Sequence, residues 1–175
     1  MRKKIISAAL SLCLICSAAV PVFAVQNSMS NFKITNTYSG TFKDVASTHW
    51  AASAVETCYE YGLMKGNSAV TFHPDGNLTV AQAIVMADRV HEIYTTGEST
   101  LQNGKTWYQP YIDYAAENGI LSEGEFKDYD AAITRAQMAS LFCNALPASE
   151  LSAINAVSSI PDIAGNPNSD KILML

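Results

Sequence analysis

The sequence predicts a mainly α-helical protein built from tandem helix-loop-helix repeats. The main observation is a pattern that occurs twice, in which Trp50 precedes Gly62 by twelve residues and Trp107 precedes Gly119 by the same twelve. The second observation is that apolar residues recur at intervals of three and four along each copy, which is typical of helices. The copies lie about 57 residues apart, a spacing found in repeat proteins, which hold a partner more often than they transform one.

The first helix of the first copy is expected to begin near His49. Ser47 or Thr48 can cap it, because a hydroxyl oxygen accepts a hydrogen bond from the free amides of the first turn. Gly62 can end it, and the turn-forming residues that follow in 66–76 indicate a loop. The predicted apolar face of this helix holds Trp50, Ala54, Val55, Cys58 and Tyr59.

The second helix of the first copy is expected to begin after Thr79, whose side chain can act as the cap. One face of this helix is apolar, and its charged residues are predicted to lie largely off that face. The apolar residues are Ala83, Ile84, Met86, Ala87, Val90 and Ile93. The charged residues are Asp88, Arg89 and Glu92.

The second copy repeats this plan with a loop that is two residues shorter. One helix is predicted from about Tyr108 to Asn118, followed by a loop over 119–133. Thr134 then caps a second apolar helix. Pro147 stops that helix, because proline has no amide hydrogen for the helical ladder.

The N-terminus has the features of a secretory signal. The basic residues Arg2, Lys3 and Lys4 precede an apolar run over 5–20, and small residues follow at the expected cleavage positions. This arrangement predicts a signal peptide over 1–24 that is cleaved on export. The run is shorter than the roughly 20 residues that span a membrane. We therefore expect an exported protein with no membrane insertion after cleavage.

The charge of the remaining chain argues against two classes of partner. Without the signal, 8 Lys and Arg face 16 Asp and Glu, a net charge of −8. Such a surface disfavours nucleic acid and anionic membranes as non-specific partners. An anionic ligand would need a local cluster of cations.

Two cysteines, Cys58 and Cys143, remain after cleavage. In an exported protein they could pair. Buried thiols on helical faces are the alternative. The sequence leaves both interpretations open, because it does not show how close the two residues lie.

The rest of the chain divides into a leader and successive copies. Residues 25–41 are rich in Asn, Ser and Thr and are predicted to form a flexible leader. The first repeat covers 42–97 and the second covers 98–150.

A third copy is predicted to begin near the C-terminus. Residues 160–163 echo residues 42–45, with Asp162 in the place of Asp44. The last residue then falls inside the first helix of this copy, so that 160–175 is an incomplete repeat and the chain looks truncated.

The order and spacing of these motifs resemble the S-layer homology (SLH) domains of bacterial surface proteins. The repeat of that family reads loosely as F-x-D-V, W-A-x-x-A-V, G-I/L-x-x-G, F-x-P and I-T-R-A-E. In the first copy these elements correspond to residues 42–45, 50–55, 62–66, 72–74 and 78–82. In the second copy they correspond to Trp107 and residues 119–121 and 133–137.

The resemblance implies an architecture and a function. In that family three repeats commonly form a pseudo-threefold unit, with the I-T-R-A-E helices at its centre and ligand sites in the grooves between repeats. The usual ligand is a secondary cell-wall polysaccharide, often carrying a pyruvate ketal, and binding is non-covalent. The resemblance therefore implies a secreted, non-enzymatic protein on the cell wall of a Gram-positive-type bacterium, with cell-wall polysaccharide as its partner and no cofactor.

The resemblance also indicates binding residues. A pyruvate ketal presents a planar carboxylate, to which a guanidinium group donates two parallel hydrogen bonds. Arg135 follows Thr134 at a helix N-terminus, where the helix dipole also favours an anion. Trp50 and Trp107 could stack on sugar faces, although we favour core positions that seal the starts of their helices. The candidate binding residues are Arg135, Thr134, Gln137, Trp107, Trp50 and Lys65.

The two copies depart from the family pattern at two positions. Val80 occupies the arginine position in the first copy, so that its groove lacks the main carboxylate donor unless Lys65 or Arg89 replaces it. Gln82 and Gln137 stand where the family usually has Glu. Glutamine can still close a capping box, which preserves helix initiation.

Other functions stay open. No nucleophile, base and orienting acid stand together at motif spacing, and the three histidines have no zinc-site pattern. The repeats could be the tether of an exported enzyme whose catalytic domain lies beyond residue 175. They could also be a degenerate scaffold without carbohydrate binding. Self-association, or a partner chain that completes the third repeat, is a further expectation.

Overall fold

The computed structural model describes residues 26–151, together with residues 165, 169 and 173. This part of the chain is mainly α-helical, as predicted, and contains no named strand. Its helices are η1 (Met29–Asn31), α1 (Ala52–Glu60), α2 (Val80–Thr96), α3 (Gln109–Glu117), α4 (Arg135–Ala145) and η2 (Ala148–Glu150), where η marks a 3-10 helix. The predicted signal at 1–24 and nearly all of the third repeat lie outside the described residues. The pseudo-threefold arrangement and the repeat boundaries therefore stay predictions.

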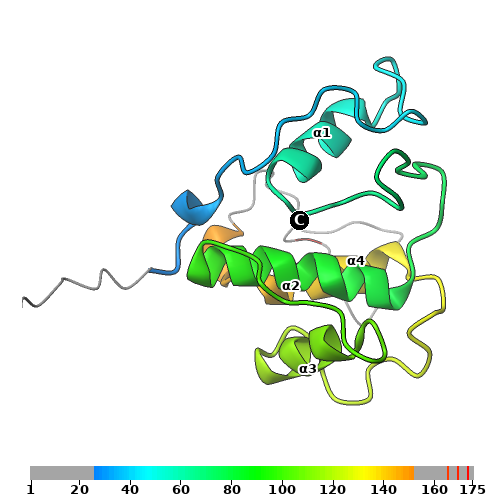
Figure 1. Ribbon diagram of the computed structural model, residues 1–175. Coiled ribbons are helices and arrows are strands. Elements are labelled where there is room, and N and C mark those ends of the chain that lie inside the picture. Colours follow the sequence, from blue (N-terminus) through cyan, green and yellow to red (C-terminus); the bar gives the residue numbers. More distant parts are fainter. Residues whose placement is uncertain (1–25, 152–164, 166–168, 170–172, 174–175) are drawn as a thin grey trace, which may run out of the picture.

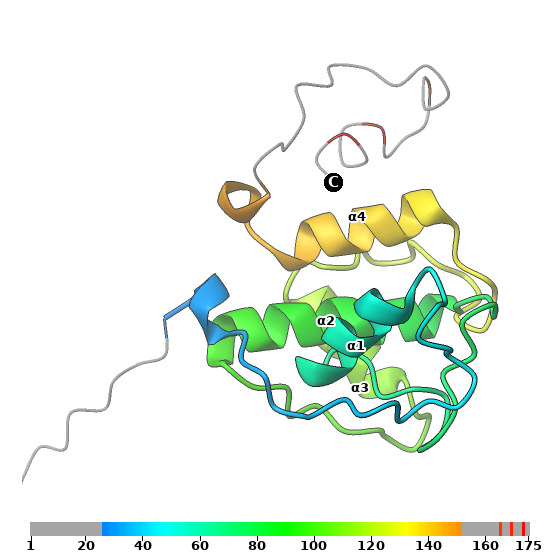
Figure 2. The same cartoon turned by 90° about the horizontal axis from the view of Figure 1, so that it is seen from above.

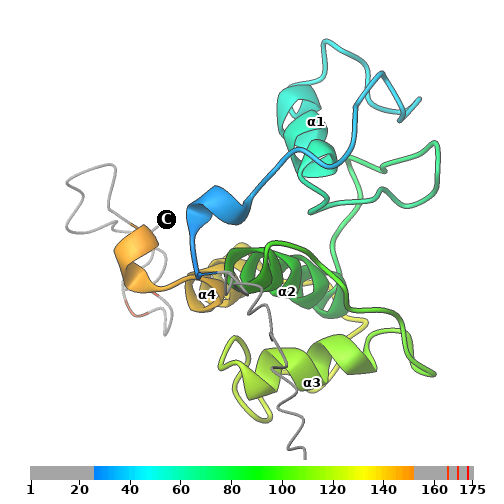
Figure 3. The ribbon, with the colours of Figure 1, turned by 60° about the vertical axis from the view of Figure 1, so that its left-hand side comes forward.

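α2 is the central helix of the described part. Figure 1 shows α1 on one side of α2 and α3 on the other, with α4 running alongside α2 behind it. The views in Figure 2 and Figure 3 show the same neighbours from above and from the side. α2 packs against α3, α4 and η1. The second helix of the first repeat thus joins both helices of the second repeat.

The surroundings of α2 overturn one prediction. Asp88 and Glu92 were expected to lie largely off the apolar face, but Asp88 is 0% exposed and Glu92 is 5% exposed. The reason is that helices cover α2 on more than one side, so that polar positions are buried along with apolar ones. Glu92 accepts hydrogen bonds from the backbone amide and hydroxyl of Thr100 at 2.8 and 2.6 Å. Asp88 has no hydrogen-bond partner among the described residues.

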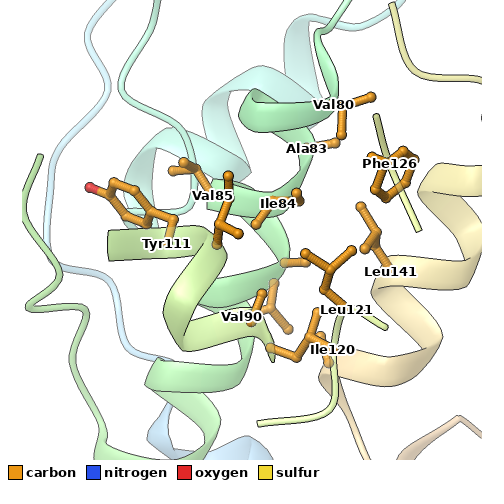
Figure 4. Close-up of a cluster of buried hydrophobic side chains, with 14 residues drawn as sticks. Val80, Ala83, Ile84, Val85, Val90, Tyr111, Ile120, Leu121, Phe126 and Leu141 are labelled. Atoms are coloured by element: carbon orange, nitrogen blue, oxygen red, sulfur yellow. The ribbon is translucent and has the colours of Figure 1, made fainter. Parts of the chain in front are cut away.

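The main core lies where α2 meets α3, α4 and the loop between them. Figure 4 shows Tyr111 of α3 reaching one side of α2, while Leu141 of α4 and Phe126 of the loop lie on another side. Ile84 and Leu141 are fully buried. Burying such a side chain stabilises the folded state by about 1.5–3 kcal/mol. The labelled members of this cluster are Val80, Ala83, Ile84, Val85, Val90, Tyr111, Ile120, Leu121, Phe126 and Leu141.

α1 belongs to a separate, smaller cluster. Phe42, Val45 and Val55 are buried there. The ring of Phe42 lies 5.4 Å from that of Tyr59, edge to face, and 5.3 Å from that of Phe72. Such aromatic pairs add to the stabilisation that burial alone provides. The motif before α1 is therefore a packing element for the loop that follows α1.

The helix caps confirm two predictions and contradict a third. Thr79 caps α2 and Thr134 caps α4, each in a capping box closed by a glutamine three residues later. The expectation that Ser47 or Thr48 caps the first helix was wrong, because α1 begins at Ala52 without a side-chain cap. A turn at His49 precedes it instead, in which the ring Nδ1 of His49 accepts from the amide of Ala51 at 3.2 Å.

The two repeats are tied together just before α2 and α4. Thr79 and Ala132 form an isolated antiparallel bridge. The amide of Val80 donates to the carbonyl of Ala131 at 2.9 Å, and that of Ala81 donates to Tyr129 at 2.9 Å. Amides in the first turn of a helix have no partner inside the helix. The loop of the second repeat therefore completes the N-terminus of α2.

The leader also differs from the prediction of a flexible segment. Asn31 donates from Nδ2 to the carbonyl of Tyr94 at 2.7 Å, near the end of α2. The amides of Thr35 and Asn36 both donate to the carbonyl of Glu60 at the end of α1. The Asn, Ser and Thr content that suggested flexibility supplies polar partners for the open carbonyls at helix ends. Residues 28–36 are a structured strap across two helices.

The cysteines can now be placed. Within the described residues no disulfide joins Cys58 to Cys143. Both side chains are half-buried, and burial raises the pKa of the Cys58 thiol. Cys58 is therefore a half-buried thiol of α1.

Candidate binding groove between the two repeats

A groove of about 410 Å³ lies between the first repeat and the start of the second. One wall is the loop that links α1 to α2, and the floor is the first half of α2. The other wall consists of residues just before α3 and in its first turn. Lys65 and Arg89 line the groove, together with His73, and no lining residue is an aspartate or glutamate. The chain as a whole carries a net charge of −5. The groove is therefore a cationic site on an acidic protein.

Residues of α2 at successive turns form the floor. Gln82, Val85, Met86 and Arg89 all line the groove, because positions three and four apart share one face of a helix. Nη1 of Arg89 donates to the carbonyl of Leu63 at 3.0 Å. That bond fixes the planar guanidinium group at the edge of the groove, where its remaining donors suit a carboxylate.

The second repeat supplies the aromatic wall. Trp107 is 39% exposed, and its ring packs edge to face against Tyr108 at 5.4 Å. Tyr111 is buried, and its hydroxyl donates to the carbonyl of Leu101 at 3.2 Å. The Trp107 ring is thus held by its neighbour while part of its surface stays open. A partly exposed, supported aromatic ring is suited to stacking against a sugar.

Residues from before α1 hold the opposite wall in place. The carboxylate of Asp44 accepts the amide of Phe72 at 2.9 Å and the amide of His73 at 2.7 Å. The pKa of Asp44 lies below its ordinary value, first because of the Phe72 amide and then because of the His73 amide. Phe42 packs on Phe72, and a Cβ at Gly66 would collide with the Phe42 ring. Gly66 therefore allows the wall to approach Phe42.

The structure brings together two of the six predicted binding residues. Lys65 and Trp107 line the groove, whereas Arg135, Thr134, Gln137 and Trp50 do not. Thr134 and Gln137 are engaged with each other, since the amide of Gln137 donates to Oγ1 of Thr134 at 3.2 Å and Oε1 of Gln137 accepts the amide of Thr134 at 3.0 Å. Arg135 is exposed in the first turn of α4.

The favoured interpretation of the tryptophans as core residues was wrong. Trp50 is 87% exposed and Trp107 is 39% exposed. Both precede their helices, and the residues that anchor those helices come later, Val55 in α1 and Tyr111 in α3. The tryptophans are therefore left on the outside. Trp50 contacts His49 with ring centroids 5.7 Å apart.

Sequence reasoning missed part of this site. Arg89 was considered only as a substitute for the arginine that Val80 replaces, Asp44 only as part of a motif, and His73 only as one of three histidines without a zinc-site pattern. The signal for Arg89 was its place on the same face as Gln82, seven residues earlier. The signal for Asp44 was its position in a motif, but the motif alone does not show which amides the carboxylate meets.

The described residues contain neither a group of side chains that could bind a metal ion nor a helix that could span a membrane. No three His, Cys, Asp or Glu side chains within residues 26–151 are grouped so that they could hold a metal ion. None of the helices in this same part is long and apolar enough to cross a membrane. The chemistry of the groove is therefore built from cations, amides and aromatic rings.

Comparisons with known proteins agree with this geometry. A family model described as the S-layer homology domain matches residues 41–84. These residues contain the Asp44 motif, α1, the groove loop and the start of α2. The match therefore covers the first repeat as far as the start of α2, and one wall of the groove.

Curated relatives extend the similarity beyond that segment. An endoglucanase of Bacillus sp. (strain KSM-635) is 32% identical over 145 residues, which is 81% of this chain and 15% of the relative. The S-layer protein sap of Bacillus anthracis is 29% identical over 109 residues, or 60% of this chain and 13% of the relative. An amylopullulanase of Thermoanaerobacterium thermosulfurigenes is 30% identical over 95 residues, or 49% and 5%.

The chain thus spans less than a sixth of the length of these three relatives. Enzymes and surface-layer proteins alike share this region, so that the region itself is not tied to one catalytic activity. The helical repeats, the motif order and the family match agree, and the chain carries an S-layer homology domain of the kind that anchors proteins at the bacterial cell surface.

Proposed function

We propose that this protein is exported and attaches non-covalently to the bacterial cell wall by binding a wall polysaccharide in the groove between the two repeats. The observation that carries the proposal is that Lys65 and Arg89 line this groove and no aspartate or glutamate does, on a protein of net charge −5. Such a lining favours an acidic group of a polymer. The S-layer homology match and the surface-layer relatives support the same function.

Each wall of the groove has a role in this proposal. Trp107 stacks on a sugar face, and Gln82 donates to or accepts from sugar hydroxyls. Arg89 and Lys65 pair with an acidic substituent such as a pyruvate ketal, with the planar guanidinium as the more selective of the two. This assignment moves the main cation from Arg135 to Arg89.

Arg135 remains a candidate for a second site. It stands directly after the cap of α4, as Val80 does after the cap of α2. We propose that it meets an acidic group of the same polymer at a site outside the groove described above.

The groove is tested by comparing Trp107→Ala with Trp50→Ala in sedimentation with purified bacterial cell-wall sacculi. Trp107 lines the groove and Trp50 lies outside it, so that the two variants remove the same side chain from different places. We expect Trp107→Ala to weaken retention about tenfold, equivalent to about 1.4 kcal/mol. Trp50→Ala should bind like the parent protein.

Helical circular dichroism serves as the folding control for both variants. Failure of the parent protein to bind sacculi would contradict the proposed function. Equal binding by the parent and Trp107→Ala would contradict the placement of the site in this groove.

A second candidate function is that of a tether for an exported enzyme. The names of two relatives, an endoglucanase and an amylopullulanase, favour it, since each is far longer than the part that matches this chain. In that case the groove still binds the wall, while catalysis belongs to another domain. Sequencing the gene downstream of the Leu175 codon distinguishes the two, because an immediate stop excludes the tether.

A degenerate scaffold without carbohydrate binding is the remaining alternative, and Val80 in the place of the family arginine is the observation that favours it. Capture on pyruvylated and depyruvylated wall polymer separates it from the main proposal. A scaffold retains neither form, whereas the cationic groove prefers the pyruvylated one.

A further inference from the structure

The wall of the groove contains a backbone conformation that is unusual for its residue. His73 has φ +70°, and it is the one non-glycine residue with positive φ in the described part of the chain. A Cβ makes this left-handed region less favourable, although histidine adopts it more readily than most residues, so that contacts with the neighbouring backbone help to decide whether the conformation is kept. His73 also lines the groove. A group that bonds to the His73 backbone therefore influences the conformation of this point of the wall.

The group in contact with this backbone is the carboxylate of Asp44. Its Oδ2 accepts the amide of His73 at 2.7 Å, and its Oδ1 accepts the amide of Phe72 at 2.9 Å. Two consecutive amides thus face one carboxylate, which fixes the peptide plane between them. The amide of Lys43 adds a backbone bond to the carbonyl of Val70 at 2.9 Å. The segment around Asp44 therefore holds the wall at several successive residues.

Asp44 itself does not line the groove, although Phe72 and His73 do. The carboxylate lies behind the wall, so that it acts on a ligand through the shape of that wall and through its charge, and not by contact. On the far side of His73, its carbonyl accepts the amide of Gly76 at 3.0 Å, which closes a tight turn. Release of the two amides would let His73 return to a more favourable φ, and the turn would move with it.

We propose that Asp44 is a positioning residue for polysaccharide binding, which fixes the groove wall by holding His73 in the left-handed conformation. This inference rests on the proposed function for its ligand. It goes beyond that function in assigning a role to a residue that never touches the polymer. The first part of the Asp44 motif, Phe42, packs the same wall from the side.

The first experiment tests, without any ligand, whether Asp44 holds the Phe72 and His73 amides. Asp44→Asn keeps the shape of the side chain but replaces one accepting oxygen with an amide that donates. Hydrogen exchange of the Phe72 and His73 amides should become at least about tenfold faster, because a slow amide is one that stays hydrogen-bonded. Asp75→Asn removes the same charge from an exposed position of the same loop and should leave both amides unchanged. Unchanged exchange in Asp44→Asn would overturn the inference.

Binding is tested with wall polysaccharide purified from sacculi and with Trp107 fluorescence as the readout. The chain has 2 tryptophans, so that all variants carry Trp50→Phe to leave Trp107 alone. Asp44→Asn should weaken binding about tenfold, or about 1.4 kcal/mol. Simple electrostatics predicts the opposite, because removal of a negative charge near the groove favours an anionic polymer. Asp75→Asn measures that electrostatic effect by itself.

A second substitution distinguishes positioning from a general structural role. Glycine adopts positive φ without strain, so that Asp44→Asn should cost little affinity in a His73→Gly background. His73→Gly alone is the reference for this comparison, because it also removes an imidazole that lines the groove, and adding Asp44→Asn to it should weaken binding by less than about threefold. A double variant that loses as much affinity relative to His73→Gly as Asp44→Asn loses relative to the parent would overturn the inference. Failure of the parent to bind would contradict the proposed function, while the exchange experiment would still decide whether Asp44 holds the wall.

Discussion

α2 and α4 begin in the same way and lie in different surroundings. Each starts with a threonine cap and a glutamine three residues later, and the amide of that glutamine lies 3.2 Å from the threonine Oγ1 in both helices. α2 then continues for 17 residues, most of them buried, whereas α4 has 11 residues and buries Ser140, Leu141 and Ala145. The repeated motif therefore determines how a helix begins, and the neighbouring helices determine what it buries.

The same contrast separates the two candidate cations. Arg89 lies on α2, in the groove that the loop of the first repeat and the start of the second repeat form on either side of this helix. Arg135 lies at the exposed start of α4. The second repeat carries the family arginine, whereas the groove lies between the loop of the first repeat and the start of the second. Corresponding motifs thus have different surroundings, because a groove needs two walls.

The largest predicted effect concerns the buried carboxylate of α2. Asp88 stands nine residues after Thr79, and the residue nine after Thr134 in α4 is Cys143. Burial, and secondly the charge of Glu92, raise the pKa of Asp88 to about 8. The folded state therefore keeps a proton that the unfolded chain loses near pH 4. The free energy of unfolding that depends on Asp88 is therefore highest below that pH and falls as the pH rises toward 8.

We predict that Asp88→Asn raises the free energy of unfolding by at most about 4 kcal/mol at pH 7, since one pKa unit corresponds to about 1.36 kcal/mol. The gain should disappear at pH 4. Urea denaturation at pH 4, 7 and 9 measures it. His91, Glu92 and Tyr114 surround this position, and burial lowers the pKa of His91. The electrostatic coupling of Glu92 and Tyr114 to Asp88 is lost in the variant and is part of the expected gain. A variant less stable than the parent at every pH would contradict the prediction.

The next largest effect distinguishes Arg89 from Arg135 as the main cation for wall binding. Arg89→Gln should weaken binding to sacculi at least about tenfold, or about 1.4 kcal/mol, because it removes the guanidinium group from the groove. Arg135→Gln should have a smaller effect in the same sedimentation measurement. Arg89→Lys keeps the charge without the planar donor pair and should recover only part of the binding. A larger loss with Arg135→Gln would return the main site to the residue that the sequence indicated.

The smallest effect concerns the caps. Thr79→Ala and Thr134→Ala should each lower the free energy of unfolding by about 1 kcal/mol, because each leaves a helix amide without its side-chain acceptor. Hydrogen exchange should then separate the two helices. Thr79→Ala should speed exchange in α3 and α4 as well as in α2, since α2 packs on both. Thr134→Ala should act mainly within α4, and an equal effect on α3 would show that α2 is not the central element.

Local features of the fold were predictable from the sequence. Thr79 and Thr134 were identified as caps because a cap depends on residues within one helical turn. The burial of Asp88 and Glu92 was not predictable, since polarity suggested solvent and the deciding neighbours come from α3 and the segment after α2. The strap formed by residues 28–36 was missed for a similar reason. Its partners are the carbonyls of Glu60 and Tyr94, which are distant in sequence.

The candidate site was predicted in part for related reasons. Lys65 and Trp107 belong to repeated motifs and were identified, and the structure places both in one groove. Trp50 has the same motif position as Trp107 but no second wall beside it among the described residues. The role of Asp44 depends on amides 28 and 29 residues away. A sequence motif can identify such a residue, but it does not show which groups the residue contacts.

The strap has a mechanical consequence for a protein that holds onto a wall. From residue 26, the chain first meets the end of α2, where the amide of Ser28 and the side chain of Asn31 bind the carbonyl of Tyr94 at 3.0 and 2.7 Å. Only afterwards does it reach Glu60 at the end of α1. A pull applied through the leader would therefore load these attachments one after the other, beginning with α2. The hydrogen bonds at the end of α2 would therefore open before those at the end of α1, and the two helices would be released in sequence.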